Sequence, residues 1–241
     1  MFVFIPYCAC SRLAARAKIR SMNIPHGMLS QTWLWSGAGI YLLTWIVVLR
    51  TTPWRRLLDN SLSHGFLGTC VLLLVLWHIA IRQFPGLNYH FLGATLLMLM
   101  FRWQLAFVGI NLILAGMILN GEGQWQTLPI NAMTMGLIPI LTGYGLYRLV
   151  ETKLPNHLFV YLFLNAFFGA AITIGVAVTV SALLLASAGV YHLDFLLTEY
   201  LPFLPLMMFP ESFITGMLTT LAVVFYPQWV LTFDDAKYLN K

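Results

Sequence analysis

The chain has 241 residues, of which 60% are hydrophobic and only 9% are charged, and its mean hydropathy is +0.81. Soluble domains carry about 25% charged residues, so this composition excludes a soluble globular domain and indicates an integral protein of the lipid bilayer. The net charge of +5 does not indicate a nucleic-acid partner, because Lys and Arg in a membrane protein mainly set its orientation. The three cysteines, Cys8, Cys10 and Cys70, provide no disulfide framework.

Seven apolar runs are candidates for crossing the bilayer. Backbone polar groups in lipid must be satisfied within the segment, which predicts helices, and a span needs about 20 residues. The third and fourth runs are short and only Arg102 separates them, so they form either one long helix or a tight hairpin. The runs are Leu29–Leu49, Leu62–Ile81, Phe91–Phe101, Trp103–Leu119, Leu128–Leu149, Leu158–Ser187 and Leu204–Tyr226.

The basic residues distinguish the two alternatives. With a hairpin at Arg102 and an outer start of the first helix, only Arg82 falls outside. One long helix would move every basic residue after Arg102 to the outer side, against the positive-inside rule. We therefore predict an all-α protein of six to seven transmembrane helices in the cytoplasmic membrane, with its N-terminus outside. The residues predicted inside are Arg50, Arg55, Arg56, Arg102, Arg148, Lys153, Lys237 and Lys241.

The first 21 residues do not fit this topology. They are basic and would lie outside, and their apolar part precedes their basic part, unlike a signal peptide. We expect that translation begins at Met22, that residues 1–21 are not part of the core protein, and that residues 22–241 form one polytopic transmembrane domain. The alternative is a genuine extension that lies at the membrane interface.

A turn-rich break, Phe84–Gly93, carries a histidine, His90, on the predicted outer side. A lone histidine at a helix start can be purely structural, but imidazole also suits late first-row metals. If Met22 is the first residue, its α-amine lies on the same side and can bind metal once deprotonated. An amine, a deprotonated amide and imidazoles form the tetragonal nitrogen set that fits Ni(II) or Cu(II).

Two further polar residues lie in apolar runs. An ionisable group at membrane depth, here Glu211, is a functional candidate, and an interfacial carboxylate is the alternative. Asn131 can hydrogen-bond across helices, which favours a packing role over a ligand role. The sequence contains no His-Glu-x-x-His, Gly-x-Ser-x-Gly or phosphate-binding Gly-x-x-x-x-Gly-Lys motif. It therefore does not indicate an enzyme, and the chain cannot hydrolyse ATP itself.

Four segments, in this order, resemble the CbiM/NikM family, the substrate-binding membrane subunits of energy-coupling-factor transporters for cobalt and nickel. The first is similar to the family's Met-His-Ile-x-Glu/Asp-Gly start, and the second to its Phe-Pro…His-Leu-x-Gly-Ala loop. The third and fourth resemble its Asn-Ala-x-x-Met-Gly and Glu-Gly-x-Ile-Thr segments. In this chain they are Met22-Asn23-Ile24-Pro25-His26-Gly27, Phe84-Pro85-Gly86 through His90-Phe91-Leu92-Gly93, Asn131-Ala132-Met133-Thr134-Met135-Gly136 and Glu211-Ser212-Phe213-Ile214-Thr215.

The resemblance implies that Co²⁺ or Ni²⁺ is the transported substrate and that there is no catalytic cofactor. It implies metal ligands at Met22, position 23 and His90, with Asn131 and Glu211 in support. It also implies a membrane coupling protein and a pair of ABC ATPases as partners.

One departure from the family keeps other functions open. Asn23 stands where the family has histidine, and His26, where the family has an acid, is the candidate to compensate. The alternative functions are a divergent member that no longer binds metal, an accessory protein or a transporter of another small solute. A membrane enzyme is the remaining alternative, and the missing motifs count against it.

The expected start at Met22 is testable by mass spectrometry of the purified protein. We expect the N-terminal peptide to begin at Met22. Recovery of a peptide that spans Arg20 to Asn23 would contradict this expectation.

Overall fold

A computed structural model describes residues 24–25 and 27–238, except for the side chains of residues 81–83. Met22, Asn23, His26 and Lys241 lie outside the described residues, as does the side chain of Arg82. In chain order the elements are α2 (Gln31–Thr51), η1 (Trp54–Leu58), α3 (Asn60–Trp77), β1 (Ala80–Phe84), β2 (Leu87–His90), α4 (Ala94–Leu119), η2 (Trp125–Thr127), α5 (Leu128–Ala132), η3 (Met133–Leu137), α6 (Ile138–Lys153), α7 (Leu158–Val160), η4 (Tyr161–Phe168), α8 (Gly169–Ser187), α9 (Leu193–Phe195), η5 (Leu196–Tyr200), η6 (Leu201–Phe203), α10 (Leu204–Phe225), η7 (Pro227–Trp229) and α11 (Asp235–Tyr238).

The predicted helical membrane fold is confirmed. Within the described part of the chain, five helical stretches are long and apolar enough to cross a membrane, and one of them has the predicted bounds Leu158–Ser187. The predicted span Leu128–Leu149 consists of α5, the π-helical η3 and α6 in succession. The fold also contains the β1–β2 hairpin, which the helical prediction did not include. The outer position of the N-terminus stays a prediction.

The chain reverses at Arg102, as the charge pattern predicted. Arg102 has φ 64° and ψ 168°, which interrupts α4. A Cβ placed on Gly109 would lie 3.4 Å from Cδ1 of Leu97, whereas twelve residues of straight helix would separate these positions by about 18 Å. The third and fourth apolar runs therefore form a hairpin, and Arg102 lies at its tip.

The β-hairpin explains how so short a third run can extend across the bundle. The helical leg 94–101 rises about 12 Å, and β2 before it adds about 13 Å because a strand advances further per residue. The strand needs a backbone partner, and β1 provides it, with Ala80 opposite His90 and Phe84 opposite Leu87. The second helix consequently ends at Trp77 instead of continuing to Ile81 as predicted.

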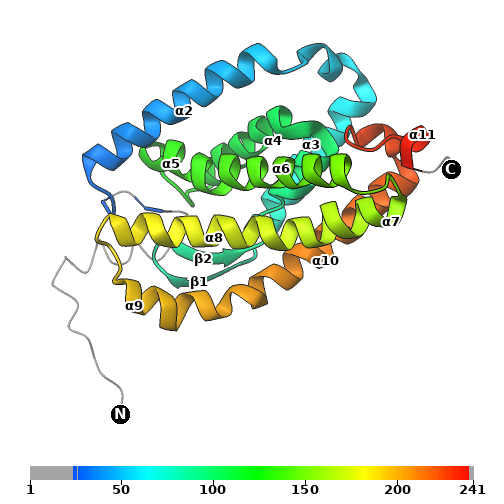
Figure 1. Cartoon of the computed structure of the whole chain (residues 1–241). Coiled ribbons are helices and arrows are strands. Elements are labelled where there is room, and N and C mark those ends of the chain that lie inside the picture. Colours follow the sequence, from blue (N-terminus) through cyan, green and yellow to red (C-terminus); the bar gives the residue numbers. More distant parts are fainter. Residues whose placement is uncertain (1–23, 26, 239–241) are drawn as a thin grey trace.

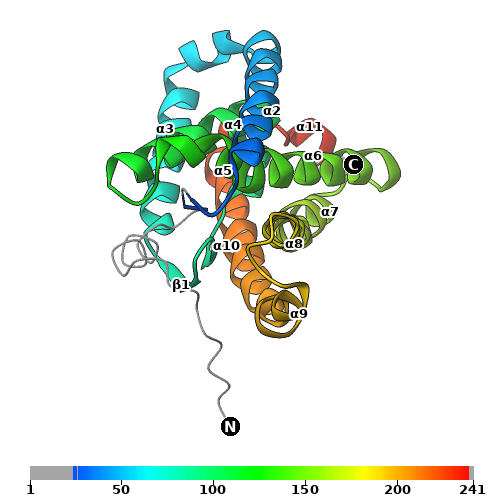
Figure 2. The same cartoon turned by 90° about the vertical axis from the view of Figure 1, so that its left-hand side faces the viewer.

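The helices pack against one another in a single bundle. α10 packs against α8 and η4, α4 packs against α3 and α6, and α6 packs against α8 (Figure 1). α2 stands apart along the top of this view and contacts mainly α5. Most of its side chains are exposed, as expected of a helix that faces lipid. Figure 2 looks onto the end of the bundle where α2 begins and α8 ends.

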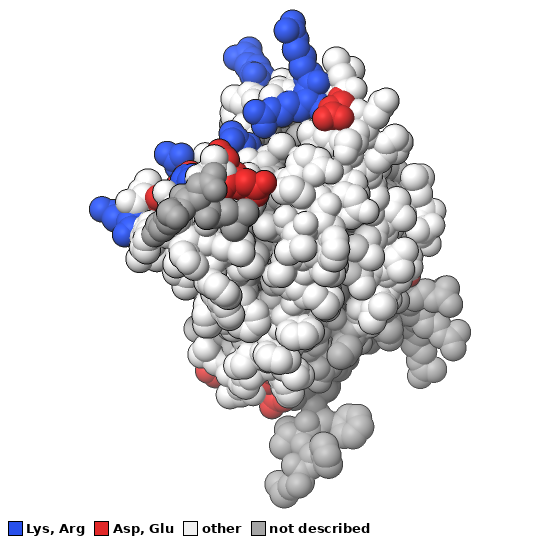
Figure 3. Space-filling view, turned by 90° about the vertical axis from the view of Figure 1, so that its right-hand side faces the viewer, with Lys and Arg blue, Asp and Glu red and all other residues white. Residues whose placement is uncertain are grey.

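The basic side chains that the structure describes lie toward the opposite end, which includes the α2–α3 and α6–α7 connections and α11 (Figure 1). Arg56, Arg102 and Lys237 line one cavity of about 670 Å³ there, together with Glu151. Lys237 Nζ lies 2.5 Å from Oε1 of Glu151, and Arg148 lies 3.4 Å from its Oε2. In Figure 3, which faces this side, Lys and Arg side chains project from one part of the surface. The predicted grouping of these residues at one end agrees with this arrangement.

Gly93 links the hairpin to α4, and a substitution there would test how closely the hairpin packs against α3. It has φ +69°, and a Cβ there would collide with Cδ2 of Leu73. We expect Gly93→Ala to lower the free energy of unfolding by about 2–4 kcal/mol, since both the backbone conformation and the contact oppose a side chain. Thermal unfolding in detergent measures this. Gly39→Ala, where nothing lies within 4 Å, is the control, and equal melting temperatures for the two variants would contradict the prediction.

Candidate functional site

His90 ends β2 and is partly buried. Its ring packs against that of Trp77 with centroids 4.9 Å apart, and its Nδ1 lies 3.1 Å from the carbonyl oxygen of Phe91. With Nδ1 donating to the carbonyl, Nε2 keeps a free lone pair and is available as a metal ligand.

A small cavity of about 30 Å³ adjoins His90. The hairpin lines it through Gly86 and Asn88, and η3 contributes Thr134 and Met135. Its volume suits one or two water molecules or a single ion. An organic solute would not fit this cavity.

Asn131 attaches the start of the described chain to this region. The N–H of Ile24 donates to Oδ1 of Asn131 at 3.1 Å, and Nδ2 of Asn131 donates to the carbonyl of Ile24 at 3.3 Å. Both residues are buried. A Cβ placed on Gly86 would lie 3.8 Å from Cα of Ile24, so Ile24 packs against the turn of the hairpin. The side-chain amide thus pairs with both polar groups of one residue, as a neighbouring strand would.

Glu211 holds the other end of the hairpin. Its carboxylate accepts the N–H of Leu92 through Oε2 and the N–H of Gly93 through Oε1, each at 2.7 Å. It lies on α10 and is only 3% exposed. Its partners follow His90 by two and three residues. Charge-assisted bonds of this kind are stronger than neutral ones, so Glu211 fixes the backbone beside the histidine.

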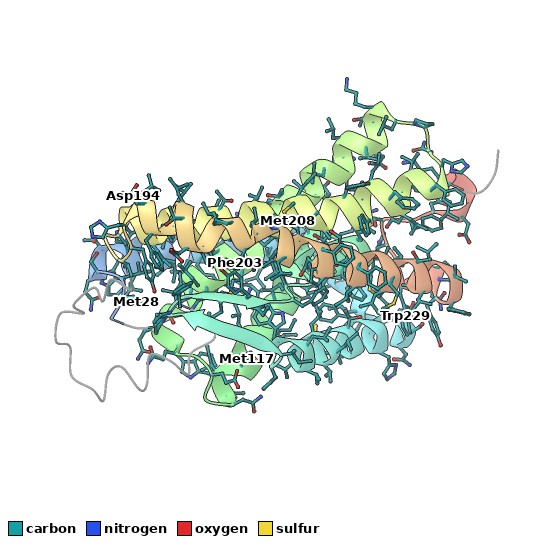
Figure 4. All side chains as sticks on the ribbon, turned by 90° about the horizontal axis from the view of Figure 1, so that it is seen from below. Met28, Met117, Asp194, Phe203, Met208 and Trp229 are labelled. Carbon is teal, nitrogen blue, oxygen red and sulfur yellow. The ribbon has the colours of Figure 1, made fainter. Side chains whose placement is uncertain are left out.

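Aromatic side chains hold the hairpin from both sides. Trp77 donates its indole N–H to the carbonyl of Leu92 at 3.1 Å. Tyr89 stacks on Tyr200 at 5.2 Å between ring centroids and lies 6.3 Å from Phe203, which Figure 4 labels just before α10. The sequence analysis did not include Trp77 among the candidate site residues. Its position at the end of an apolar run, just before the turn-rich break, could have indicated that it contacts the hairpin.

The structure brings His90, Asn131 and Glu211 to the same hairpin. Met22, Asn23 and His26 lie outside the described residues. Among the residues that the structure describes, no three His, Cys, Asp or Glu side chains lie together as a metal-binding group.

Comparison with known proteins identifies the family. Residues 23–229 match CbiM, described as the cobalt uptake substrate-specific transmembrane region. A crystal structure of a truncated transition metal transporter is similar, with 21% identity and a TM-score of 0.68, over 84% of this chain and 98% of that chain. A second transition metal transporter shows 23% identity and a TM-score of 0.60, over 86% and 92%. At these identities the likeness shows a shared fold. No curated protein matches the chain.

The role of Glu211 is testable by Glu211→Gln. An amide keeps only one acceptor and turns its NH₂ toward a backbone N–H, so we expect a loss of about 2–4 kcal/mol in unfolding free energy. That corresponds to a fall of roughly 5–15 °C in melting temperature. The control is Glu199→Gln, since Glu199 is exposed and its loss should have little effect. A melting temperature for Glu211→Gln equal to that of the control would refute this role.

Proposed function

The chain belongs to the CbiM family of substrate-specific transmembrane regions for cobalt uptake, and we propose that it captures Co²⁺ or Ni²⁺ for an uptake transporter. The transported metal is its substrate and not a resident cofactor. The family is that of a transporter membrane component, and catalysis forms no part of the proposal.

The observation that carries this proposal is the pair of hydrogen bonds between Asn131 and the backbone of Ile24. They hold the N-terminal segment against the turn of the hairpin whose second strand ends at His90. Met22 precedes Ile24 by two residues, which span at most about 7 Å. In a chain that starts at Met22, the terminal amine therefore lies within reach of the cavity that His90 lines.

The proposed ligands are the amine of Met22, the amide nitrogen of Asn23 and Nε2 of His90, with the imidazole of His26 as a fourth nitrogen. Amine, deprotonated amide and imidazole together fit a tetragonal Ni²⁺ or Cu²⁺ site, and Co²⁺ is the metal that the family description favours. The side chain of Asn23 offers an oxygen or a weak amide donor instead of an imidazole. We therefore expect a lower affinity than a histidine at this position would give.

Asn131 and Glu211 support the site without binding the metal. Asn131 orients the segment that ends at the amine, and Glu211 orients the backbone beside His90. Groups that position metal ligands commonly change affinity by about 10–100-fold when they are removed. The cavity beside His90, about 30 Å³, favours a single ion over a small organic solute as the cargo.

Transport requires partners in this proposal. The sequence contains no phosphate-binding loop, so energy from ATP would come from ABC ATPase subunits through a membrane coupling protein. The positive-inside rule orients the basic end of the bundle, with Arg56 and Arg102, toward the cytoplasm. His90 then lies toward the outer face of the cytoplasmic membrane, where the cation arrives.

Isothermal titration calorimetry of purified protein that starts at Met22 tests the proposal. We expect Ni²⁺ or Co²⁺ to bind, and we expect His90→Ala to weaken binding at least about 100-fold by removing an imidazole ligand. His78→Ala is the matched control, because His78 is an exposed histidine whose Nδ1 lies 2.7 Å from the carbonyl oxygen of Leu74 in the preceding helix. Its affinity should equal that of the unmodified protein.

Two results would count against the proposal in different ways. Equal binding by His90→Ala and the unmodified protein would remove His90 from the site. Failure of the unmodified protein to bind either metal would favour the divergent family member that Asn23 suggests.

A further inference from the structure

Further polar side chains are buried in the core of the bundle, in line with Glu211 on α10. On α10 the residues Glu211, Thr215 and Thr219 follow one another at four-residue intervals and thus share one helix face. Their exposed fractions are 3%, 0% and 0%. α10 packs mainly against α8 and η4 and also contacts α4.

Several of these polar atoms have no hydrogen-bond partner in the described part of the chain. They are the hydroxyls of Thr215 and Thr219, the hydroxyl of Thr95 and both amide atoms of Asn165. A helical threonine often returns its hydroxyl to the carbonyl four residues earlier, as Thr220 does to Gly216 at 2.7 Å. Buried polar groups nearly always have a protein or water partner, so this concentration requires an explanation.

The segments that carry these atoms, α4, η4 and α10, contact one another. Oγ1 of Thr95 and Oγ1 of Thr173 lie 3.8 Å and 3.5 Å from the position of a Cβ on Gly143, so α4, α6 and α8 approach one another at this glycine. Asn165 is 2% exposed and belongs to η4, which packs on α10. We refer to Thr95, Asn165, Glu211, Thr215 and Thr219 as the polar row.

The polar row continues toward both ends of the bundle. At one end Glu211 accepts the backbone N–H groups beside His90. At the other end Tyr161, one turn before Asn165, lies 2.7 Å from Oγ1 of Thr232. Thr232 lines the charged cavity of about 670 Å³.

We propose that the polar row binds internal water molecules, which join the hairpin end of the bundle to this charged cavity. Water both donates and accepts, so it can satisfy hydroxyls and a side-chain amide that the surrounding apolar side chains cannot. A bound cation is a poorer fit, because Glu211 is the only anionic member of the row and both its oxygens already accept N–H groups. The protein thus contains a hydrated connection inside a bundle whose outer surface faces lipid.

Thr215→Val and Thr219→Val test the proposal, because the presence or absence of bound water determines whether each substitution lowers or raises the melting temperature. Valine has nearly the shape of threonine but no hydroxyl, so each substitution deprives a bound water of a partner. We expect each to lower the melting temperature by about 2–4 °C. A row without water would give the opposite sign, because valine would remove an unsatisfied buried hydroxyl. Thr220→Val, whose hydroxyl bonds within its own helix, is the control and should change little.

X-ray radiolysis with mass spectrometry provides an independent readout, because bound water generates hydroxyl radicals beside it. Met98 and Met117 are both fully buried, but only Met98, whose Cε lies 3.1 Å from the same position on Gly143, adjoins the row. We expect Met98 to oxidise several-fold faster than Met117, and Thr215→Val/Thr219→Val to reduce the difference. Equal oxidation of the two methionines, or valine variants with raised melting temperatures, would overturn the proposal. Neither readout involves metal binding by His90, so each proposal can fail alone.

Discussion

Two backbone N–H groups at the switch from β2 to α4 set the geometry of the candidate site, and Glu211 satisfies both. A strand inside a membrane bundle leaves polar backbone groups that lipid cannot satisfy. β1 pairs with β2 on one side, and the carboxylate of Glu211 accepts the next two N–H groups, of Leu92 and Gly93. His90 lies just before this clamp, so its position depends on a side chain that is 118 and 119 residues away from the groups it holds.

Asn131 binds the backbone of Ile24 with its side chain, as Glu211 binds the backbone of the hairpin. It pairs with both polar groups of Ile24 across 107 residues of sequence. Two segments without helical structure are thereby fixed by side chains from α5 and α10.

The rest of the fold positions the two segments that Glu211 and Asn131 bind. The strand of the hairpin covers the depth that the short third run cannot cover as a helix, and the turn at Arg102 returns the chain to the bundle. Aromatic rings of Trp77 and Tyr200 pack on the hairpin, so it is held by side chains from α3 and η5. The charged cavity lies at the other end of the bundle, and the buried threonines of α10 lie between the two.

The sequence by itself determined the membrane class, the approximate positions of most helical spans, the reversal at Arg102 and the candidates His90, Asn131 and Glu211. These follow from apolar run length, from the placement of charges and from short motifs, all of which are local properties of the chain. Only the tertiary structure decided that the break at residues 84–93 is a β-hairpin, that Glu211 binds backbone N–H groups and that Asn131 holds Ile24. Strand pairing and backbone satisfaction depend on which distant segment lies opposite, and no local pattern specifies that partner.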